Sequence, residues 1–116
     1  MNLFICYSKC STCKKARDFL NENHISFQER DIKGENPTYE ELKKWYLMSG
    51  FSLRKFFNTS GNLYKEMNLK EKLPLMSEEE QLKLLSSNGM LVKRPLLITD
   101  EKVFVGFKES EYLSLL

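Results

Sequence analysis

A Cys-x-x-Cys pattern made by Cys10 and Cys13 lies between a predicted strand and a predicted helix. The apolar run of residues 3–7 precedes the pattern, and residues 14–20 follow it with the spacing of an amphipathic helix. A cysteine at the start of a helix lies near unpaired backbone N–H groups and the positive end of the helix dipole, and both stabilise a thiolate. The strand–loop–helix setting therefore indicates a redox pair rather than half of a metal site.

The two cysteines are predicted to have different roles. Cys10 is expected to be the exposed, activated thiol at the helix start, where Lys9, Lys14 and Lys15 add positive charge. Cys13 falls one turn into the helix and could attack a mixed disulfide formed on Cys10. Its side of the helix also carries Ala16, Arg17 and Leu20.

Two other interpretations of the cysteines compete with this one. A zinc site needs four ligands, and the only further candidates are Cys6 and His24, with no second Cys-x-x-Cys, so no metal is expected. Cys10 and Cys13 could also be two ordinary buried residues, because free cysteine often behaves as a small hydrophobic side chain. Cys6 lies inside the first predicted strand and is expected to be a core residue. We favour the redox pair.

Composition limits the classes of protein that this chain can represent. A length of 116 residues fits one domain, spanning residues 1–116, with a hydrophobic core of its own. The formal charge of +2 is small and its charges are interspersed, so direct nucleic-acid binding is not expected. No apolar stretch reaches membrane-spanning length, and no signal peptide is evident. Three cysteines, an odd number, do not indicate a secreted disulfide scaffold, so a cytoplasmic location is expected.

The N-terminal part of the chain predicts a βαβ unit. Strands are expected over residues 2–7 and 25–32, with a helix over residues 12–22 between them. The crossover in such a unit is almost always right-handed. Residues 33–37 are predicted to form a turn.

A helical block is predicted over residues 38–90. Its two longer helices each open with a capping box, in which a Ser or Thr is followed three residues later by Glu. The boxes are Thr38 with Glu41 and Ser77 with Glu80. Gly50 is expected to end the first of these helices, and residues 63–67 form a weaker helical segment between the two.

The C-terminal part predicts a ββα unit. Residues 96–99 and 102–107 have the spacing of a hairpin, and a last helix is expected over residues 110–116. The predicted fold is therefore α/β, with a mixed four-stranded sheet and a helical insertion between the βαβ and ββα halves.

This arrangement, with Cys-x-x-Cys at the first strand–helix junction, resembles the thioredoxin fold. The whole chain further resembles the arsenate reductase (ArsC) family, in the branch that also contains the Spx and MgsR regulators. Three motifs carry the resemblance, and a fourth adds a weaker match. They lie at residues 7–16 (YSKCSTCKKA), 57–61 (FNTSG), 93–96 (KRPL) and, more weakly, 105–109 (VGFKE).

The resemblance implies roles for residues around Cys10. The proline before the third strand of such folds is usually cis and lies beside the active cysteine, which Pro95 matches. Arg94 would then hold a thiolate or an oxyanion near Cys10, and Thr12 would hydrogen-bond the thiolate. The alternative for Arg94 and Pro95 is a solvated arginine beside a strand-edge proline.

The chain departs from the arsenate-reducing members of the family. Those members surround the anion with three arginines; Arg94 matches one, and Arg54 or Lys55 the second. Residues 106–108, near the third position, contain a lysine and no arginine. Efficient arsenate reduction is therefore not expected.

The chain also departs from the Spx-like regulators. Those proteins bind the C-terminal domain of the RNA polymerase α subunit, and a glycine in the helical block contributes to that contact. Ser52 occupies the corresponding position here, and the longer basic tail that is usual in such regulators is absent from this sequence, which stops at Leu116.

The resulting hypothesis is a monomeric thiol–disulfide oxidoreductase. Cys10 attacks, Cys13 resolves, and an external glutathione, glutaredoxin or thioredoxin system reduces the Cys10–Cys13 disulfide. No cofactor is required. The alternative hypothesis is a redox-switched regulator that binds the RNA polymerase α subunit.

Overall fold

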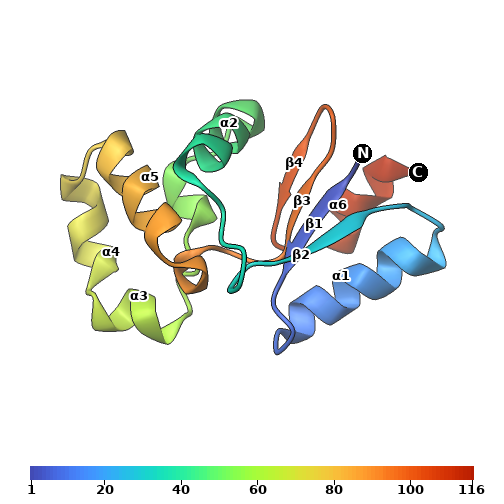
Figure 1. Ribbon diagram of the computed structural model, residues 1–116, viewed down its shortest axis with the longest axis horizontal. Coiled ribbons are helices and arrows are strands. Elements are labelled where there is room, and N and C mark those ends of the chain that lie inside the picture. The colour runs from blue at the N-terminus through green and yellow to red at the C-terminus, as the bar shows by residue number, and fades with distance from the viewer.

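A mixed four-stranded sheet lies at the centre of the fold in the computed structural model, which describes residues 1–116 (Figure 1). The strand order is β2-β1-β3-β4, with β1 parallel to β2 and antiparallel to β3, and with β3 antiparallel to β4. The strands are β1 (Leu3–Cys6), β2 (Gln28–Asp31), β3 (Leu96–Ile98) and β4 (Val103–Val105). The predicted α/β class, sheet type and hairpin are confirmed.

Helices cover both faces of this sheet. Two of them, α1 (Ser11–Glu22) and α6 (Glu109–Tyr112), lie on one face, and the helical block lies on the other (Figure 1). The block contains α2 (Tyr39–Ser49), α3 (Asn62–Glu66), α4 (Leu69–Lys72) and α5 (Glu78–Ser87). Short 3₁₀ turns are η1 (Leu53–Phe56), η2 (Leu73–Leu75), η3 (Gly89–Leu91) and η4 (Leu113–Leu115).

The alternation of side chains along the strands produces two separate hydrophobic cores. Ile5 of β1 packs in the larger core with residues of the helical block, whereas its neighbours Phe4 and Cys6 pack in the smaller core with α1 and α6. Successive residues of a strand point to opposite faces of a sheet, so both faces of β1 are apolar. Cys6 is buried as predicted, on the same side of the sheet as Cys13.

The signals that open and close the longer helices are confirmed. The hydroxyl oxygens of Thr38 and Ser77 accept hydrogen bonds from the backbone N–H groups of Glu41 and Glu80, at 3.2 and 3.1 Å. Each glutamate accepts a bond in return from its capping residue, which completes the capping box. Gly50 ends α2 in the left-handed conformation, with φ of 69°.

Some element boundaries differ from those predicted. The second strand is expected over residues 25–32, but β2 covers only Gln28–Asp31, because its one partner, β1, offers only the four residues Leu3–Cys6 for pairing. Beyond the predicted helical segment at residues 63–67, the chain forms an additional short helix, α4, after Asn68 adopts a positive φ of 54°. The predicted last helix is divided into α6 and η4.

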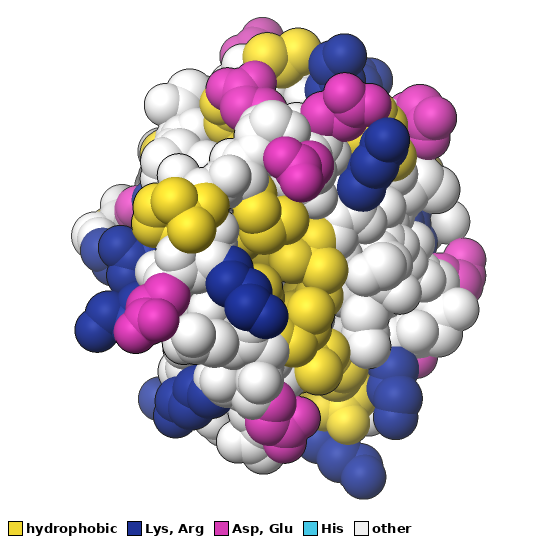
Figure 2. Space-filling view, turned by 90° about the vertical axis from the view of Figure 1, so that its left-hand side faces the viewer, with side chains coloured by type: hydrophobic (Ala, Val, Ile, Leu, Met, Phe, Trp, Pro, Cys, Tyr) yellow, Lys and Arg dark blue, Asp and Glu magenta, His cyan; other side chains and the backbone are white.

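The outer face of the helical block, turned away from the sheet, has a mixed surface. Hydrophobic side chains gather along its middle, with basic and acidic side chains around them (Figure 2). Leu47 of α2 and Leu75 of η2 are exposed large hydrophobic side chains of the block. None of the helices combines the length and apolar character needed to cross a membrane.

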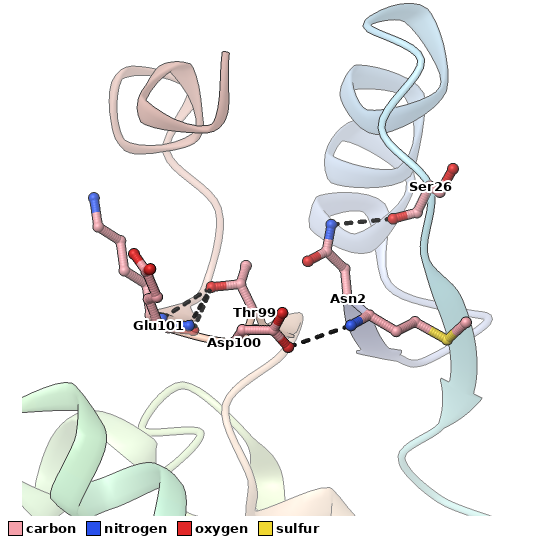
Figure 3. A network of polar contacts seen from close by, with 7 residues as sticks. Asn2, Ser26, Thr99, Asp100 and Glu101 are labelled. Atoms are coloured by element: carbon pink, nitrogen blue, oxygen red, sulfur yellow. Dashed lines mark hydrogen bonds and ion pairs between the residues drawn. The ribbon is translucent and has the colours of Figure 1, made fainter.

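The N-terminus is tied to two neighbouring segments (Figure 3). Its amino group lies 3.2 Å from the carboxylate of Asp100 in the β3–β4 turn, and the side-chain amide of Asn2 donates to the carbonyl of Ser26 at 3.1 Å. The N-terminal ion pair is largely exposed to solvent and contributes little to stability.

Two contacts join the helical block to the edge strand. The guanidinium of Arg30 makes two hydrogen bonds, of 2.7 and 2.8 Å, to the carboxylate of Glu41 at the start of α2. This pairing is the largest of the influences that lower the pKa of Glu41. Gly89, at the start of η3, packs directly against the backbone of Ile32 at the end of β2. A Cβ atom at this position would overlap the Ile32 carbonyl oxygen.

We therefore expect Gly89→Ala to lower the free energy of unfolding by about 3 kcal/mol, the upper end of the usual cost of overpacking, because backbone must move. Gly50→Ala is the matched control. Its Cβ would meet no atom within 4 Å, so only the left-handed conformation is penalised, at about 1 kcal/mol. Urea unfolding of both variants measures the difference. An equal or smaller loss for Gly89→Ala would contradict the close approach.

Candidate functional site

Cys10 is the residue that caps the N-terminus of α1. Its backbone is extended, with φ of −102° and ψ of 117°, and its sulfur accepts a hydrogen bond from the Cys13 backbone N–H at 3.4 Å. A sulfur in the capping position satisfies one of the N–H groups that a helix start leaves unpaired. The Cys10 N–H donates to the carbonyl of Tyr7 at 3.1 Å, which closes the turn between β1 and α1.

The surroundings of Cys10 lower its pKa below the ordinary value for a thiol. Partial burial is the largest single influence and would raise the pKa, but the influences that lower the pKa together outweigh it, beginning with hydrogen bonds from the backbone and side chain of Cys13. The backbone N–H of Thr12 and the positive charge of Arg94 act in the same direction as those bonds. Cys10 is therefore the thiol of this pair that ionises first.

Cys13 has the opposite character. Its side chain is completely buried, and its sulfur accepts a hydrogen bond from the Tyr7 backbone N–H at 3.3 Å. An interaction with the Cys6 side chain is the largest influence that raises the pKa of Cys13, and burial is the second. Cys13 is thus a buried, protonated thiol one helical turn after Cys10.

Arg94 and Pro95 lead from η3 into β3. The peptide bond between them is cis, as the resemblance implied. The Arg94 guanidinium lies over the ring of Tyr7, with 5.1 Å between its Cζ atom and the ring centroid, and Nη1 donates to the Met90 carbonyl at 3.5 Å. These contacts hold a permanent positive charge near Cys10.

A cavity of about 620 Å³ opens next to this turn. Three of the predicted site residues, Thr12, Arg54 and Arg94, line it together. Lys55, the alternative to Arg54 for the second cation, also lines the cavity, and its amino group lies 3.7 Å from the centroid of the Phe51 ring.

Two further lysines contribute to the lining of the cavity. Lys93 and Lys108 join Arg54, Lys55 and Arg94, and Glu111 is the one carboxylate in the lining. Lys108 lies near the position at which, by the resemblance, arsenate-reducing members carry their third arginine. Five cations against one carboxylate make the cavity suitable for an anionic group.

The remaining lysines near the turn point elsewhere. The amino group of Lys14 pairs with Asp18 at 2.8 Å, and Lys14 is not part of the cavity lining. Lys9 and Lys15 are exposed. The structure therefore brings Thr12, Arg54 and Arg94 together in the lining of the cavity, whereas Cys10 and Cys13 are not part of that lining. Cys10 is linked to the lining through the Thr12 N–H and the charge of Arg94, while Lys14 faces solvent on α1.

The motif at residues 57–61 supports the cavity from the side of the helical block. Phe57 pairs with Val92 as an isolated antiparallel bridge, and the Asn58 N–H donates to the Leu91 carbonyl at 2.8 Å. Gly61 leaves room for the Asn58 side chain, whose amide nitrogen would lie 2.6 Å from an added Cβ. This packing fixes the loop that contributes Thr59 to the lining.

Sequence reasoning missed a polar contact to Cys6. Nη2 of Arg17 donates to the Cys6 sulfur at 3.1 Å, while Nε of the same side chain pairs with Glu29 of β2 at 2.7 Å. The spacing offered a signal, because Arg17 follows Cys13 by four residues and so lies on the same face of α1. The sequence could not show that Cys6 lies beneath that face.

Comparison with known proteins identifies the family. The sequence model of the ArsC family matches residues 6–115. The chain belongs to the ArsC family. The protein YusI of Bacillus subtilis is 55% identical to it over 109 residues, which cover 94% of this chain and 92% of YusI. The global transcriptional regulator Spx of Enterococcus faecalis is 34% identical, covering 88% of this chain and 76% of Spx.

Solved structures of similar proteins share the fold. An ArsC family related protein from Bacteroides fragilis superimposes with a TM-score of 0.97 and 54% identity, covering 99% of this chain and 97% of that protein. A possible arsenate reductase from Streptococcus mutans gives a TM-score of 0.88 and 41% identity, covering 93% and 92%. The relatives of this ArsC-family protein thus include both reductase-like proteins and regulators.

We expect Cys10 to be alkylated first among the three cysteines at mildly acidic pH. Its lowered pKa keeps part of the thiol ionised there, whereas burial and the bond to Cys6 keep Cys13 protonated. Iodoacetamide labelling followed by peptide mass mapping measures the order. Arg94→Gln should move the labelling profile of Cys10 to higher pH, with Lys83→Gln on α5 as a remote control. Preferential labelling of Cys13 or Cys6 would contradict the assignment.

Proposed function

We propose that this ArsC-family protein is a thiol–disulfide oxidoreductase that uses Cys10 and Cys13 as its redox pair. The observation that carries the proposal is the asymmetry of the two thiols. One is half-buried at a helix N-terminus with a lowered pKa, and the other is fully buried one turn later with a raised pKa. A nucleophilic thiol and a resolving thiol need this difference, because only the nucleophile must be ionised in the resting state.

The reaction begins when the Cys10 thiolate attacks one sulfur of a disulfide substrate. A bond forms between the Cys10 sulfur and that sulfur, and the other half of the substrate leaves as a thiolate. Cys13 then loses its proton and attacks Cys10, forming the Cys10–Cys13 disulfide and releasing the second half of the substrate. Two electrons from an external thiol pair return both cysteines to the reduced state.

The cavity beside Cys10 favours substrates that carry negative charge. Arg54, Lys93 and Lys108 can neutralise carboxylate, phosphate or sulfonate groups attached to the disulfide. Arginine binds a tetrahedral oxyanion through two parallel hydrogen bonds, whereas lysine acts as a point charge. A cavity with lysine at position 108 is therefore better suited to a charged disulfide than to arsenate. A glutathione, glutaredoxin or thioredoxin system, in a reducing cytoplasm, would supply the electrons.

Steady-state assays with glutathione, glutaredoxin and thioredoxin systems test this proposal. We expect turnover of a negatively charged disulfide, its abolition in Cys10→Ser, and little reduction of arsenate. Lys108→Arg should raise arsenate turnover by supplying the missing guanidinium, whereas Lys83→Arg on the remote helix α5 should leave it unchanged. Arsenate turnover by the unmutated protein that equals its disulfide turnover would show that a third arginine is not needed.

A second candidate function is a redox-switched regulator. The identity of 34% to Spx of Enterococcus faecalis favours it, as does the hydrophobic surface on the outer face of the helical block (Figure 2). The same Cys10–Cys13 disulfide would then act as a sensor that oxidises once per event. By the resemblance, Ser52 occupies the position at which the Spx-like regulators have glycine. Its φ of −70°, at the start of η1, is ordinary. Its side chain would lie where a partner's backbone should approach.

We expect neither the reduced nor the oxidised protein to bind the RNA polymerase α C-terminal domain with micromolar or tighter affinity, because Ser52 adds a side chain at the contact point. Titration of the labelled domain with both redox states measures this directly. Ser52→Gly serves as the sensitised variant, and Ser49→Gly as the matched control at the end of α2. Micromolar or tighter binding to the unmutated protein that depends on the disulfide would make the regulator the leading function.

A further inference from the structure

The outer edge of β4 carries backbone groups that no other strand uses. β4 is the last strand of the sheet and pairs with β3 alone. The Lys102 carbonyl and the Gly106 N–H bond to the residues that flank β3, at 2.9 and 2.8 Å. Backbone groups alternate between the two sides of an antiparallel strand. The N–H and C=O groups of Val103 and Val105 therefore face away from β3, and they make no hydrogen bond to another segment.

Solvent reaches this edge of the sheet. The side chains of Val103 and Val105 pack in the larger core, yet the two residues retain exposures of 6% and 7%, whereas Leu96 and Leu97 of β3 have none. Unpaired N–H and C=O groups at a sheet edge form a template on which another extended chain can pair. The edge of β4 is thus a polar surface that lacks its partner.

Two cavities lie along this edge, one after the other. Residues 105–108 line the cavity beside Cys10, and residues 101–104 line a second cavity of about 340 Å³. Glu111 of α6 lines both cavities. The lining therefore follows the chain without a break from the first cavity into the second. An occupant that enters beside Cys10 can continue along β4 toward the β3–β4 turn.

The two cavities offer different side chains. The cavity beside Cys10 is the cationic one, and its lysines at positions 93 and 108 make no salt bridge. The second cavity has an apolar wall made by Met48 of α2 and Phe51, and hydroxyl groups of Ser110 and Ser114 face it from the α6 side of the sheet. A chain on this edge would meet cations near its cysteine and an apolar wall farther away.

The walls of the second cavity decide what kind of chain can reach the edge. Because α2 and α6 cover opposite faces of the sheet, residues of both helices border the cavity, and β4 is recessed between them. The β4 edge of a second copy of this protein is recessed in the same way, so the two edges could not meet. A single extended polypeptide, with no layers of its own, fits the recess.

We propose that the edge of β4 binds an extended segment of an oxidised protein as an added strand, with acidic side chains of that segment in the cavity beside Cys10. This inference rests on the proposed function and names its substrate class. Hydrogen bonds to the backbone of Val103 and Val105 supply affinity, and the cations select segments that carry carboxylates near the cysteine. The Cys10 sulfur bonds to the segment's sulfur, and the other half of the substrate disulfide leaves as a thiolate.

A trapped complex tests the added strand directly. In Cys13→Ser, a mixed disulfide of Cys10 with the symmetric peptide acetyl-Thr-Val-Glu-Cys-Glu-Val-Thr-amide cannot be resolved. We expect the Val103 or Val105 amide proton to exchange about tenfold more slowly there than in the mixed disulfide with N-acetylcysteine, because the flanking chain supplies a hydrogen-bond partner. The amide of Phe104, which faces β3, is the internal reference and should not change. Hydrogen exchange followed by NMR measures all three.

Backbone methylation of the peptide tests the hydrogen bonds without altering the protein. The peptide is supplied as its mixed disulfide with nitrothiobenzoate, whose release reports attack by Cys10. Alternate amides of an added strand face β4, so N-methylation of one alternate set should lower the second-order rate constant about fivefold for each hydrogen bond lost, and methylation of the other set should not. The two methylated peptides are matched controls for each other.

Exchange of both peptide glutamates for glutamine tests the choice of acidic segments. The rate constant should fall with the unmutated protein, and Lys93→Gln should reduce this difference between the two peptides. Lys83→Gln on the remote helix α5 should preserve the difference. An equal rate for the acidic and the neutral peptide would overturn the selection of carboxylates.

The outcomes separate this inference from the proposed function. Equal rates for the two methylated peptides, or unchanged exchange at both Val103 and Val105, would overturn the added strand and leave the Cys10–Cys13 pair intact. A dimer in sedimentation experiments whose Val103 and Val105 amides are protected without peptide would also overturn it, because a second copy would then occupy the edge. Failure of Cys10 to form a mixed disulfide with either the peptide or N-acetylcysteine would overturn the proposed function and the inference together.

Discussion

The hydrogen bond from the start of α1 to the Cys10 sulfur is the interaction on which the site depends. The sulfur occupies the position that a serine or aspartate oxygen takes at most helix starts, so a backbone N–H holds the sulfur of Cys10 in place. The turn between β1 and α1 is short, and the same turn directs the Tyr7 N–H to the Cys13 sulfur. One piece of local geometry therefore positions both thiols.

The sheet and its two cores keep this turn in place. β1 lies between β2 and β3, and its side chains are packed on both faces, so the end of β1 has little freedom to move. The helical block supplies the other half of the site from a region distant in sequence. Arg54 and Thr59 come from the block, Arg94 follows it, and all three line one cavity with Thr12 of α1. A substrate in that cavity would contact both α1 and the helical block.

Much of the fold could be predicted because its signals are local. The two capping boxes, Gly50 at a helix end and the hairpin spacing near the C-terminus each depend on a few neighbouring residues, and each is confirmed. The errors fall where tertiary context decides. β2 is shorter than its pattern because its one partner, β1, offers only four residues for pairing, and α4 depends on Asn68 adopting a conformation that sequence rarely signals.

The sequence by itself determined the Cys-x-x-Cys motif, the α/β order and the family, since these depend on residue types at fixed spacing. The tertiary structure alone decided which charges meet the thiols. Lys14 is adjacent to the motif but turns to Asp18, while Arg94, more than eighty residues away, lies near Cys10. The sequence predicts Cys6 as a core residue, and only the packing of α1 on β1 brings the Arg17 guanidinium to within 3.1 Å of its sulfur. The physical reason is that electrostatic effects depend on distance in space, and chain folding brings together groups whose sequence separation carries no information about that distance.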